Sequence, residues 1–324
     1  MTFSPNYVNS YAHFGIHETM LKDSVRTHTF RTAILDNPHL FRDKVVLDVG
    51  CGTGILSCFA ARAGAARVYA VDCSHIVDQT RLIVRKNGLQ DVITVIESRV
   101  EHLQLPEAVD IIVSEWMGYF LLDEFMLPSV LHARDNWLKP GGLMFPNKAS
   151  VWLCGCDDAE LRAEKLDFWH DVCGVDMSCM KSFSISEPAI EIVPDNHVTT
   201  TIHNVLSLDL QTCTTADLRF ISPFQLRALR PNKLQAVLGY FCVSFTHGRE
   251  PLQLNTGPMC DPTHWKQTIF FLDDTIPMDN NELLTGVIAV QQNKNNERDL
   301  DIALEYKFNG NMAIRCNLLR YRLR

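Results

Sequence analysis

The glycine-rich stretch at residues 50–54 constrains the fold more than any other feature. It joins the β-branched run KVVLDV (residues 44–49) to ILSCFAARAG (residues 55–64), which has the composition of a helix. Glycines let such a loop adopt positive φ and bring the backbone close to a ligand. Asp72 ends the next apolar run about 20 residues later, where a carboxylate can accept hydrogen bonds from a ribose. The pattern predicts a strand–loop–helix unit that binds a nucleoside-containing cofactor.

The spacing of the glycines distinguishes two cofactor classes. A dinucleotide loop reads G-x-G-x-x-G, and Ile55 stands where its last glycine should be. The spacing here is G-x-G-x-G, formed by Gly50, Gly52 and Gly54, and it suits a nucleoside that carries an amino-acid tail. S-adenosylmethionine is therefore favoured over NAD, and a methyltransferase over a dehydrogenase. Glu101 is a candidate to hold the adenine amino group, with a solvated turn as the alternative reading.

Strands and helices alternate through the first part of the chain. Strands are predicted at residues 44–49, 67–72, 92–97 and 109–115, and helices at 55–64, 76–87 and 125–138. This alternation predicts an α/β fold with a parallel sheet covered on both faces. After Phe145-Pro146 the sequence becomes β-rich, which predicts an antiparallel barrel or sandwich. Residues 160–179 interrupt it with helical spacing, and their apolar stripe must pack on the parent domain or on a second subunit.

Length, charge and cysteine usage narrow the class of protein. The 324 residues suit two domains, and the formal net charge of -8 disfavours nucleic-acid binding and favours basic partners. Eleven cysteines without paired spacing indicate reduced thiols in the cytosol or nucleus, and no metal site is predicted. The start lacks the pattern of a signal peptide, and no apolar run suggests a membrane span.

The stretch SEWMGYFLLDE (residues 114–124) sets Glu115 and Glu124 among large apolar side chains. Two such carboxylates repel each other unless a cation lies between them or one takes a proton. A guanidinium fits best, because its planar fork of donors matches carboxylates. Enzymes of this fold that methylate base amino groups tend to have a Pro-Pro-aromatic motif at this place, and Pro-Pro is absent from the chain. The alternative reading of Glu124 is a favourable interaction with the dipole of the following helix.

Three blocks together resemble the protein arginine methyltransferases. SEWMGYFLLDE resembles their double-glutamate loop, YVNSYAHFGIHETMLKDSVRT (residues 7–27) their N-terminal cofactor-covering helices, and DPTHWKQT (residues 261–268) their Thr-His-Trp loop. The blocks occur in the family order and span nearly the whole chain, and the pattern is closest to the type I enzymes. The resemblance implies N-terminal helices at residues 1–32, a Rossmann-like S-adenosylmethionine domain at 33–145, and a β-barrel substrate domain at 146–324. It also implies a helical dimerisation arm at about 157–185.

The same resemblance implies a role for each matching residue. Glu115 and Glu124 would clamp the substrate guanidinium, and His264 would pair with Asp23. The substrate pocket would include Met117 and Trp265. Cofactor contacts are implied for Gly50, Gly52, Gly54 and Asp72, for Val100 and Glu101 at adenine, for Arg26 at the carboxylate, and for Tyr11, His17 and Met20. The base that removes the proton stays unassigned, and a purely structural hydrogen bond is the alternative reading of His264.

Three departures from the family pattern concern the cofactor. The family's Tyr-Phe-x-x-Tyr is here Tyr7-Val8-Asn9-Ser10-Tyr11, Asp72 is one methylene shorter than the usual glutamate, and Cys51 replaces a serine. None of these departures removes a catalytic group, but each is expected to affect the affinity for the cofactor or the closure of the N-terminal helices over the site.

The sequence therefore predicts an enzyme that transfers methyl groups from S-adenosylmethionine to protein arginines and releases S-adenosylhomocysteine. Monomethyl and asymmetric dimethylarginine are the implied products, and arginine-glycine-rich segments of RNA-binding proteins and histones the implied substrates. The alternative function is a catalytically weak or regulatory scaffold subunit of a hetero-oligomer. A homodimer or a hetero-oligomer with a paralogous subunit, in the cytoplasm and also the nucleus, is expected.

Overall fold

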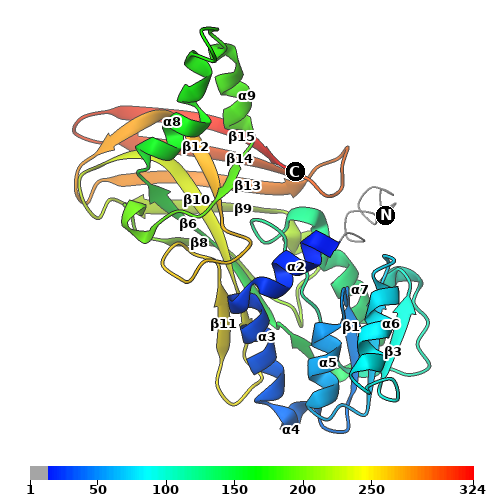
Figure 1. Cartoon of the computed structure of the whole chain (residues 1–324). Coiled ribbons are helices and arrows are strands. Elements are labelled where there is room, and N and C mark those ends of the chain that lie inside the picture. The colour runs from blue at the N-terminus through cyan, green and yellow to red at the C-terminus, as the bar shows by residue number, and fades with distance from the viewer. Residues whose placement is uncertain (1–13) are drawn as a thin grey trace.

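The computed structural model describes residues 14–324 and shows an α/β half joined to a β-rich half (Figure 1). The α/β half contains a five-stranded parallel sheet in the order β3-β2-β1-β4-β5. Its strands are β1 (Val45–Val49), β2 (Arg67–Asp72), β3 (Ile93–Glu97), β4 (Val109–Val113) and β5 (Leu138–Phe145). Its helices are α2 (Phe14–Lys22), α3 (Ser24–Leu35), α4 (Pro38–Phe41), α5 (Ile55–Arg62), α6 (Val77–Lys86), η1 (Val100–His102), η2 (Asp123–Phe125) and α7 (Leu127–Trp137).

The strand order places a crevice beside β1. The chain moves from β1 to β2 on one side and later returns to β4 on the other side, so the connections diverge at the carboxyl ends of β1 and β4. Open α/β sheets bind their ligands at such a switch point. The glycine loop follows β1 and Glu115 follows β4, so both predicted motifs begin at this crevice.

The predicted strands and helices of this half are present with small differences at their ends. β4 ends at Val113, two residues before the predicted end, which leaves Glu115 in a loop. The helix predicted at residues 125–138 ends at Trp137, and Pro140-Gly141-Gly142 lies inside β5. The register between β4 and β5 shifts between Val109 and Ile111, so this strand is irregular where the glycines occur.

The β-rich half is built from two antiparallel sheets that form the predicted barrel. One sheet has the order β7-β12-β10-β6-β8, with β11 beside β10, and the other has the order β15-β14-β13-β9. The Tyr321 hydroxyl donates to the Phe271 carbonyl at 2.8 Å, and a bridge pairs Thr200 with Ala228, so contacts join the sheets at both edges. The strands are β6 (Lys148–Cys156), β7 (Ala189–Glu191), β8 (His203–Asp209), β9 (Phe220–Arg227), β10 (Asn232–Phe245), β11 (Leu252–Asn255), β12 (Gln267–Met278), β13 (Leu283–Gln292), β14 (Leu300–Asn309) and β15 (Ile314–Leu323).

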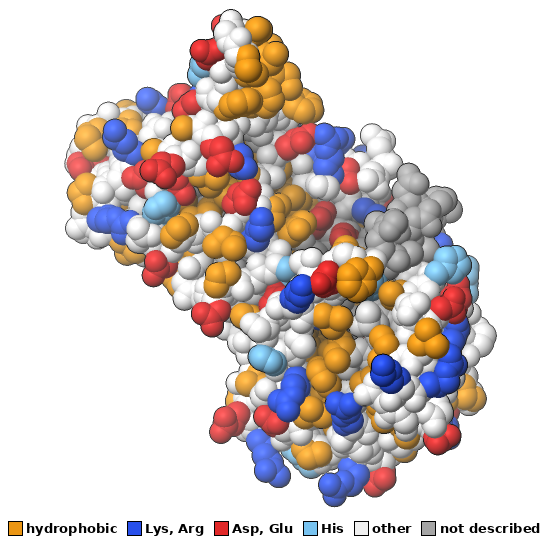
Figure 2. All heavy atoms as spheres, in the orientation of Figure 1, with side chains coloured by type: hydrophobic (Ala, Val, Ile, Leu, Met, Phe, Trp, Pro, Cys, Tyr) orange, Lys and Arg blue, Asp and Glu red, His pale blue; other side chains and the backbone are white. Residues whose placement is uncertain are grey.

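The inserted segment after β6 projects from the barrel (Figure 1). It consists of α8 (Ala159–Lys165), η3 (Asp167–His170), η4 (Ser178–Met180) and α9 (Lys181–Ser186). The single helix predicted over residues 160–179 is wrong, because the chain reverses at Cys173 and Gly174, both of which have positive φ. Figure 2 shows hydrophobic side chains gathered on this projection, where Phe168, Val175 and Phe183 are exposed.

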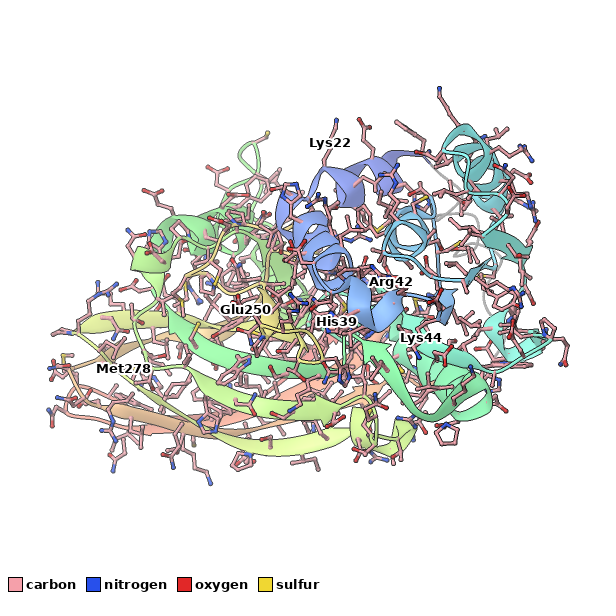
Figure 3. The ribbon with its side chains drawn as sticks, turned by 90° about the horizontal axis from the view of Figure 1, so that it is seen from below. Lys22, His39, Arg42, Lys44, Glu250 and Met278 are labelled. Atoms are coloured by element: carbon pink, nitrogen blue, oxygen red, sulfur yellow. The ribbon has the colours of Figure 1, made fainter. Side chains whose placement is uncertain are left out.

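The helices before β1 connect the two halves. The Phe30 ring of α3 lies 5.0 Å from the Phe245 ring of β10, edge to face. The Asn37 side chain accepts a hydrogen bond of 3.0 Å from the backbone N–H of Arg249, in the turn between β10 and β11. Lys22 at the end of α2 points away from the protein in Figure 3. The domain boundaries at residues 32 and 145 stay predictions.

No helix within residues 14–324 is both long and apolar enough to span a membrane.

Candidate active site

A cavity of about 280 Å³ lies at the switch point. It is lined by helices α2 and α3, the glycine loop with the start of α5, the ends of β2 and β3 with η1, the loop after β4 with the start of α7, and the loop before β12. The predicted residues on its wall are His17, Met20, Arg26, Gly50, Gly52, Asp72, Val100, Glu101, Glu115, Met117, Glu124, His264 and Trp265. Asp23 and Gly54 stand outside the wall, and Tyr11 lies outside the described residues.

The glycine loop turns tightly at the end of β1. Gly50, Gly52 and Gly54 all have positive φ, a conformation that glycine adopts without strain. A Cβ on Gly50 would collide with the Met126 side chain, and one on Gly54 with Thr80. These positions therefore accept a side chain only if neighbouring side chains move.

Asp72 fixes this loop as well as facing the cavity. One carboxylate oxygen accepts the Gly52 N–H at 3.0 Å, and the other accepts the Ser74 N–H and hydroxyl at 2.9 and 2.8 Å. Each oxygen has more than one lone-pair direction, so a ribose hydroxyl can still donate to it. The Asp72 carboxylate is thus hydrogen-bonded to the glycine loop and to the turn that follows β2.

Glu101 has one engaged and one unsatisfied oxygen. Oε1 accepts the Ser129 hydroxyl at 2.5 Å, while Oε2 is buried without a hydrogen-bond partner and lies 3.7 Å from Arg99 Nε. Burial opposes ionisation, but the hydrogen bond from Ser129 and the neighbouring Arg99 lower the pKa of Glu101. A buried anionic acceptor on this cavity fits the amino group of an adenine ring.

His17 and Met20 bring the N-terminal helices onto the cavity. His17 is buried in α2, and its ring approaches Gly52 closely enough to leave little room for a Cβ there. The Met20 carbonyl accepts a hydrogen bond of 3.4 Å from Arg26 Nη1, which ties α2 to α3.

The cation beside Glu115 is Arg26. Its Nε and Nη2 each lie 2.8 Å from Glu115 Oε2, and the two side chains are only 8% and 7% exposed. A buried pair of this kind persists because neither charge can be left alone without a large desolvation cost. The carboxylate that the sequence assigned to a substrate guanidinium therefore already binds a guanidinium of its own chain.

Glu124 is held in a strained loop. It lies in η2 with φ of 65°, and Phe120, Leu121 and Phe125 nearby also have positive φ. Its backbone N–H donates to the Arg298 carbonyl at 3.0 Å, and Arg298 Nη1 donates back to the Glu124 carbonyl at 3.2 Å. Strain of this kind persists only where surrounding contacts hold it, and it clusters at functional sites. The glutamate stands before α7 rather than in its first turn.

Asp23 and His264 form a contact that joins the α/β half to the β-rich half. Asp23 caps α3 by accepting the Arg26 N–H at 2.9 Å, and its other oxygen meets the His264 N–H at 2.9 Å and Nδ1 at 2.7 Å. Burial opposes ionisation, but these bonds together lower the pKa of Asp23. Trp265 follows, and its Nε1 donates to the Met117 carbonyl at 2.9 Å. The His-Trp loop thus positions both α3 and the double-glutamate loop.

Several residues of the site were missed in the sequence. Met126 and Ser129 line the cavity next to Gly50 and Glu101. Asp48 lies beneath the glycine loop; it accepts the Ser57 hydroxyl at 2.6 Å, and its other oxygen is buried without a hydrogen-bond partner. Burial raises the pKa of Asp48 to about 7. An acid inside a β-branched run was the available signal for Asp48.

Asp123 is a third acid of the double-glutamate loop. Burial, followed by the negative charge of Glu124, raises the pKa of Asp123 to about 7. Within residues 14–324, no group of three or more His, Cys, Asp or Glu side chains is arranged to hold a metal ion.

Comparisons with known proteins agree with this geometry. A family model for the arginine methyltransferase oligomerization subdomain matches residues 147–311, and one for a methyltransferase domain matches residues 46–142. The chain is 47% identical to protein arginine N-methyltransferase 1 of Chlamydomonas reinhardtii, over 100% of this chain and 94% of that protein. It is 48% identical to the enzyme of the same name from Schizosaccharomyces pombe, over 95% and 91%.

The chain belongs to the protein arginine N-methyltransferase family.

Solved structures of this methyltransferase family share the whole fold. A Trypanosoma brucei PRMT1 enzyme–prozyme heterotetrameric complex with AdoHcy superposes with a TM-score of 0.95, at 46% identity, over 97% of this chain and 100% of that chain. Arabidopsis thaliana protein arginine methyltransferase 10 in an open conformation gives 0.90 at 30% identity, over 98% and 99%. The C-terminal half of this arginine methyltransferase is therefore an oligomerisation subdomain.

The site of this arginine methyltransferase fits S-adenosylmethionine, its cofactor. Glycines without room for side chains, the Asp72 carboxylate and the unsatisfied Glu101 oxygen supply what a nucleoside needs. When bound, the cofactor supplies a methyl group already activated on a sulfonium. The chain has to align the acceptor with that methyl group and control the charge around it.

Proposed function

We propose that this chain is a type I catalytic subunit, which forms monomethyl and then asymmetric dimethylarginine in arginine-glycine-rich protein segments. RNA-binding proteins and histones carry such segments. In this role Glu115 and Glu124 bind the substrate guanidinium, and Arg26 binds the cofactor carboxylate.

The Arg26–Glu115 pair is the observation that supports this proposal most directly. In it the Glu115 carboxylate is buried and accepts two guanidinium donors at 2.8 Å. A substrate arginine needs the same environment. Glu124, on the same cavity wall, offers the second carboxylate.

The two glutamates would act through charge. A free guanidinium has a pKa above about 12 and delocalised lone pairs, so it is a poor nucleophile. Glu115 and Glu124 would draw positive charge onto two of its nitrogens and leave electron density on the third. The guanidinium then loses a proton, and Glu124 and the His264–Asp23 pair are both candidates to accept it.

Glu115→Gln tests the clamp. Methylation of an arginine-glycine peptide should fall at least 100-fold, while binding of labelled S-adenosylmethionine stays within a few-fold, because the amide no longer draws charge from the guanidinium. Glu107→Gln, at a half-buried carboxylate outside the active-site cavity, serves as the matched control and should retain activity. Methylation by Glu115→Gln at the wild-type rate would contradict the proposal.

Product type is tested separately by mass spectrometry of the methylated peptide. Asymmetric dimethylarginine as the final product supports type I, and symmetric dimethylarginine would contradict it. Absence of any methylation by the chain alone, restored by a paralogous subunit, would favour the regulatory alternative.

Assembly with a related subunit is part of the proposal. The Trypanosoma brucei relative is described as an enzyme–prozyme heterotetramer, and the projecting segment of this chain exposes Phe168, Val175 and Phe183. Exposed apolar side chains of this size are typical of contact surfaces. Light scattering on the chain alone and with candidate paralogues distinguishes a homodimer from a hetero-oligomer.

A cytoplasmic location, extending to the nucleus, is also proposed from the substrates. Imaging of the fluorescently tagged chain tests it, and confinement to an organelle lumen would contradict it.

A further inference from the structure

The outer face of the β9–β13–β14–β15 sheet carries a row of residues with unusual composition. The register aligns Ile221, Ala289, Ala303 and Arg320 across the four strands. Side chains alternate between the two faces of a strand, and the residues next to these four, such as Val290 and Ile302, are buried in the barrel. The row therefore points outward, and its two central positions are alanines.

A cavity of about 620 Å³ lies over this row, between the sheet and α9. The alanines form its floor, with Ile221 at one side and Phe183 of α9 on its wall. Ile221 is 73% exposed and Phe183 is 55% exposed. A solvent-facing side of an antiparallel sheet normally carries polar side chains, so an exposed apolar floor of this kind marks a contact surface.

Arginines surround this floor. Arg219, Arg320, Arg322 and Arg324 line the cavity, against two acids, Asp301 and Glu187. Both acids are already engaged: Asp301 lies 3.5 Å from Arg322, and Glu187 pairs with Arg324. For Arg219 and Arg320, the structure of residues 14–324 contains no side-chain ion pair. The surface thus has a positive excess in a chain whose net charge is -8.

The charge excludes the methylation substrate as the occupant. Arginine-glycine-rich segments are cationic, and four arginines would repel them. The cavity shares no lining residue with the active site. Arg219 lies next to β9, and Arg320 lies on β15. The two strands are three strand spacings apart, which is roughly 14 Å. About four residues of an extended peptide cover that distance.

From these observations we propose that this surface binds an acidic, extended segment of a partner protein, with an apolar side chain on the alanine floor. Its carboxylates pair with Arg219 and Arg320, whose fork of donors suits them. The proposal is independent of the substrate and product assignments made above, because the surface lies outside the active-site cavity.

Fluorescence anisotropy with the full chain tests the proposal. The probe is a labelled peptide in which glutamates alternate with leucines, and a lysine–leucine peptide is the comparison. The acidic peptide should bind and the basic one should not. The double variant Arg219→Glu/Arg320→Glu should weaken binding at least tenfold, and Ala303→Trp, which fills the floor without changing charge, should also weaken it.

The matched control is Arg85→Glu/Lys86→Glu on the exposed end of α6, which changes the net charge equally and should leave binding within twofold. Methylation of an arginine-glycine peptide reports folding and should be retained in every variant. Unchanged peptide binding in Arg219→Glu/Arg320→Glu, equal loss in the control, or preferential binding of a single-stranded RNA would each overturn the proposal.

Discussion

At the residue scale, the carboxylates of the site differ in their ion-pair and hydrogen-bond partners. Glu115 pairs with Arg26, Asp23 with His264, and Asp48 has an oxygen without a partner. The sequence shows Glu115 and Glu124 because both interrupt an apolar stretch. It could not show that Arg26 reaches Glu115, because that pairing depends on how α3 packs over the sheet.

Asp48 makes stability depend on pH. Its pKa is raised to about 7, so the folded protein holds a proton that the unfolded chain releases near pH 4. Stability should therefore fall as pH rises from about 4 to 7, and level off above. Between pH 5 and 7.5 the loss from this group is roughly 2–3 kcal/mol.

Asp48→Asn removes this contribution. In urea unfolding of the ligand-free protein, the variant should lose roughly 2–3 kcal/mol less than wild type between pH 5 and 7.5. Asp123 titrates in both proteins and cancels in the comparison. Identical pH profiles for the two proteins would contradict the assignment.

Asp23 supports both a helix and a loop. Asp23→Ala removes the cap of α3 and the partner of His264, and should cost about 3 kcal/mol of unfolding free energy. Asp23→Asn keeps an oxygen for the Arg26 N–H and should lose clearly less. Chemical denaturation measures both, and an equal loss would mean that the cap contributes nothing.

At the element scale, prediction worked where hydrophobic patterns were uninterrupted. β1, α5 and β2 were located to within two residues, because β-branched runs and a bounding glycine mark their ends. In the β-rich half, β13 and β15 are poorly marked in the sequence. Gly286 interrupts β13 where a Cβ would collide with Phe224, and the first five residues of β15 are exposed, so neither shows an apolar alternation.

The projecting segment was predicted as an arm but not with its internal turn. Helical spacing continues in the sequence across Cys173 and Gly174, while the backbone reverses there. A single cysteine-glycine pair does not show by itself whether a helix ends, because the reversal depends on contacts between the two arms of the segment.

Shortening this segment tests coupling between assembly and activity. Replacing residues 167–180 by a glycine-serine linker keeps α8, whose Arg162 donates to the Leu272 and Asp273 carbonyls at 2.9 Å. Oligomer mass in light scattering and methylation rate should fall together, the rate at least tenfold. A monomer with full activity would separate the two properties.

At the scale of the whole molecule, charge distribution sets how substrates arrive. The chain carries a net charge of -8, and the active-site wall carries four acids, Asp72, Glu101, Glu115 and Glu124, against two arginines, Arg26 and Arg99. Such a field attracts cationic segments over distances that salt shortens.

Salt should therefore act on KM. Raising sodium chloride from 50 to 200 mM should increase KM for a peptide with several arginines severalfold, with kcat within twofold. A peptide with a single arginine should respond much less. Equal changes in KM for the two peptides in steady-state kinetics would contradict attraction of the substrate by the negative charge of the protein.

The Arg26–Glu115 pair also has a consequence for the sequence of events in a turnover. Both Arg26 donors contact Glu115 Oε2, so a second guanidinium that takes both carboxylate oxygens of Glu115 requires Arg26 to move aside. On the proposed roles, the carboxylate of the methyl donor is what draws Arg26 away. The donor then enters first and the protein substrate second, and each tightens the binding of the other by the same factor. In such an enzyme a guanidinium of the chain itself contacts the carboxylate that is proposed to bind the guanidinium of the substrate.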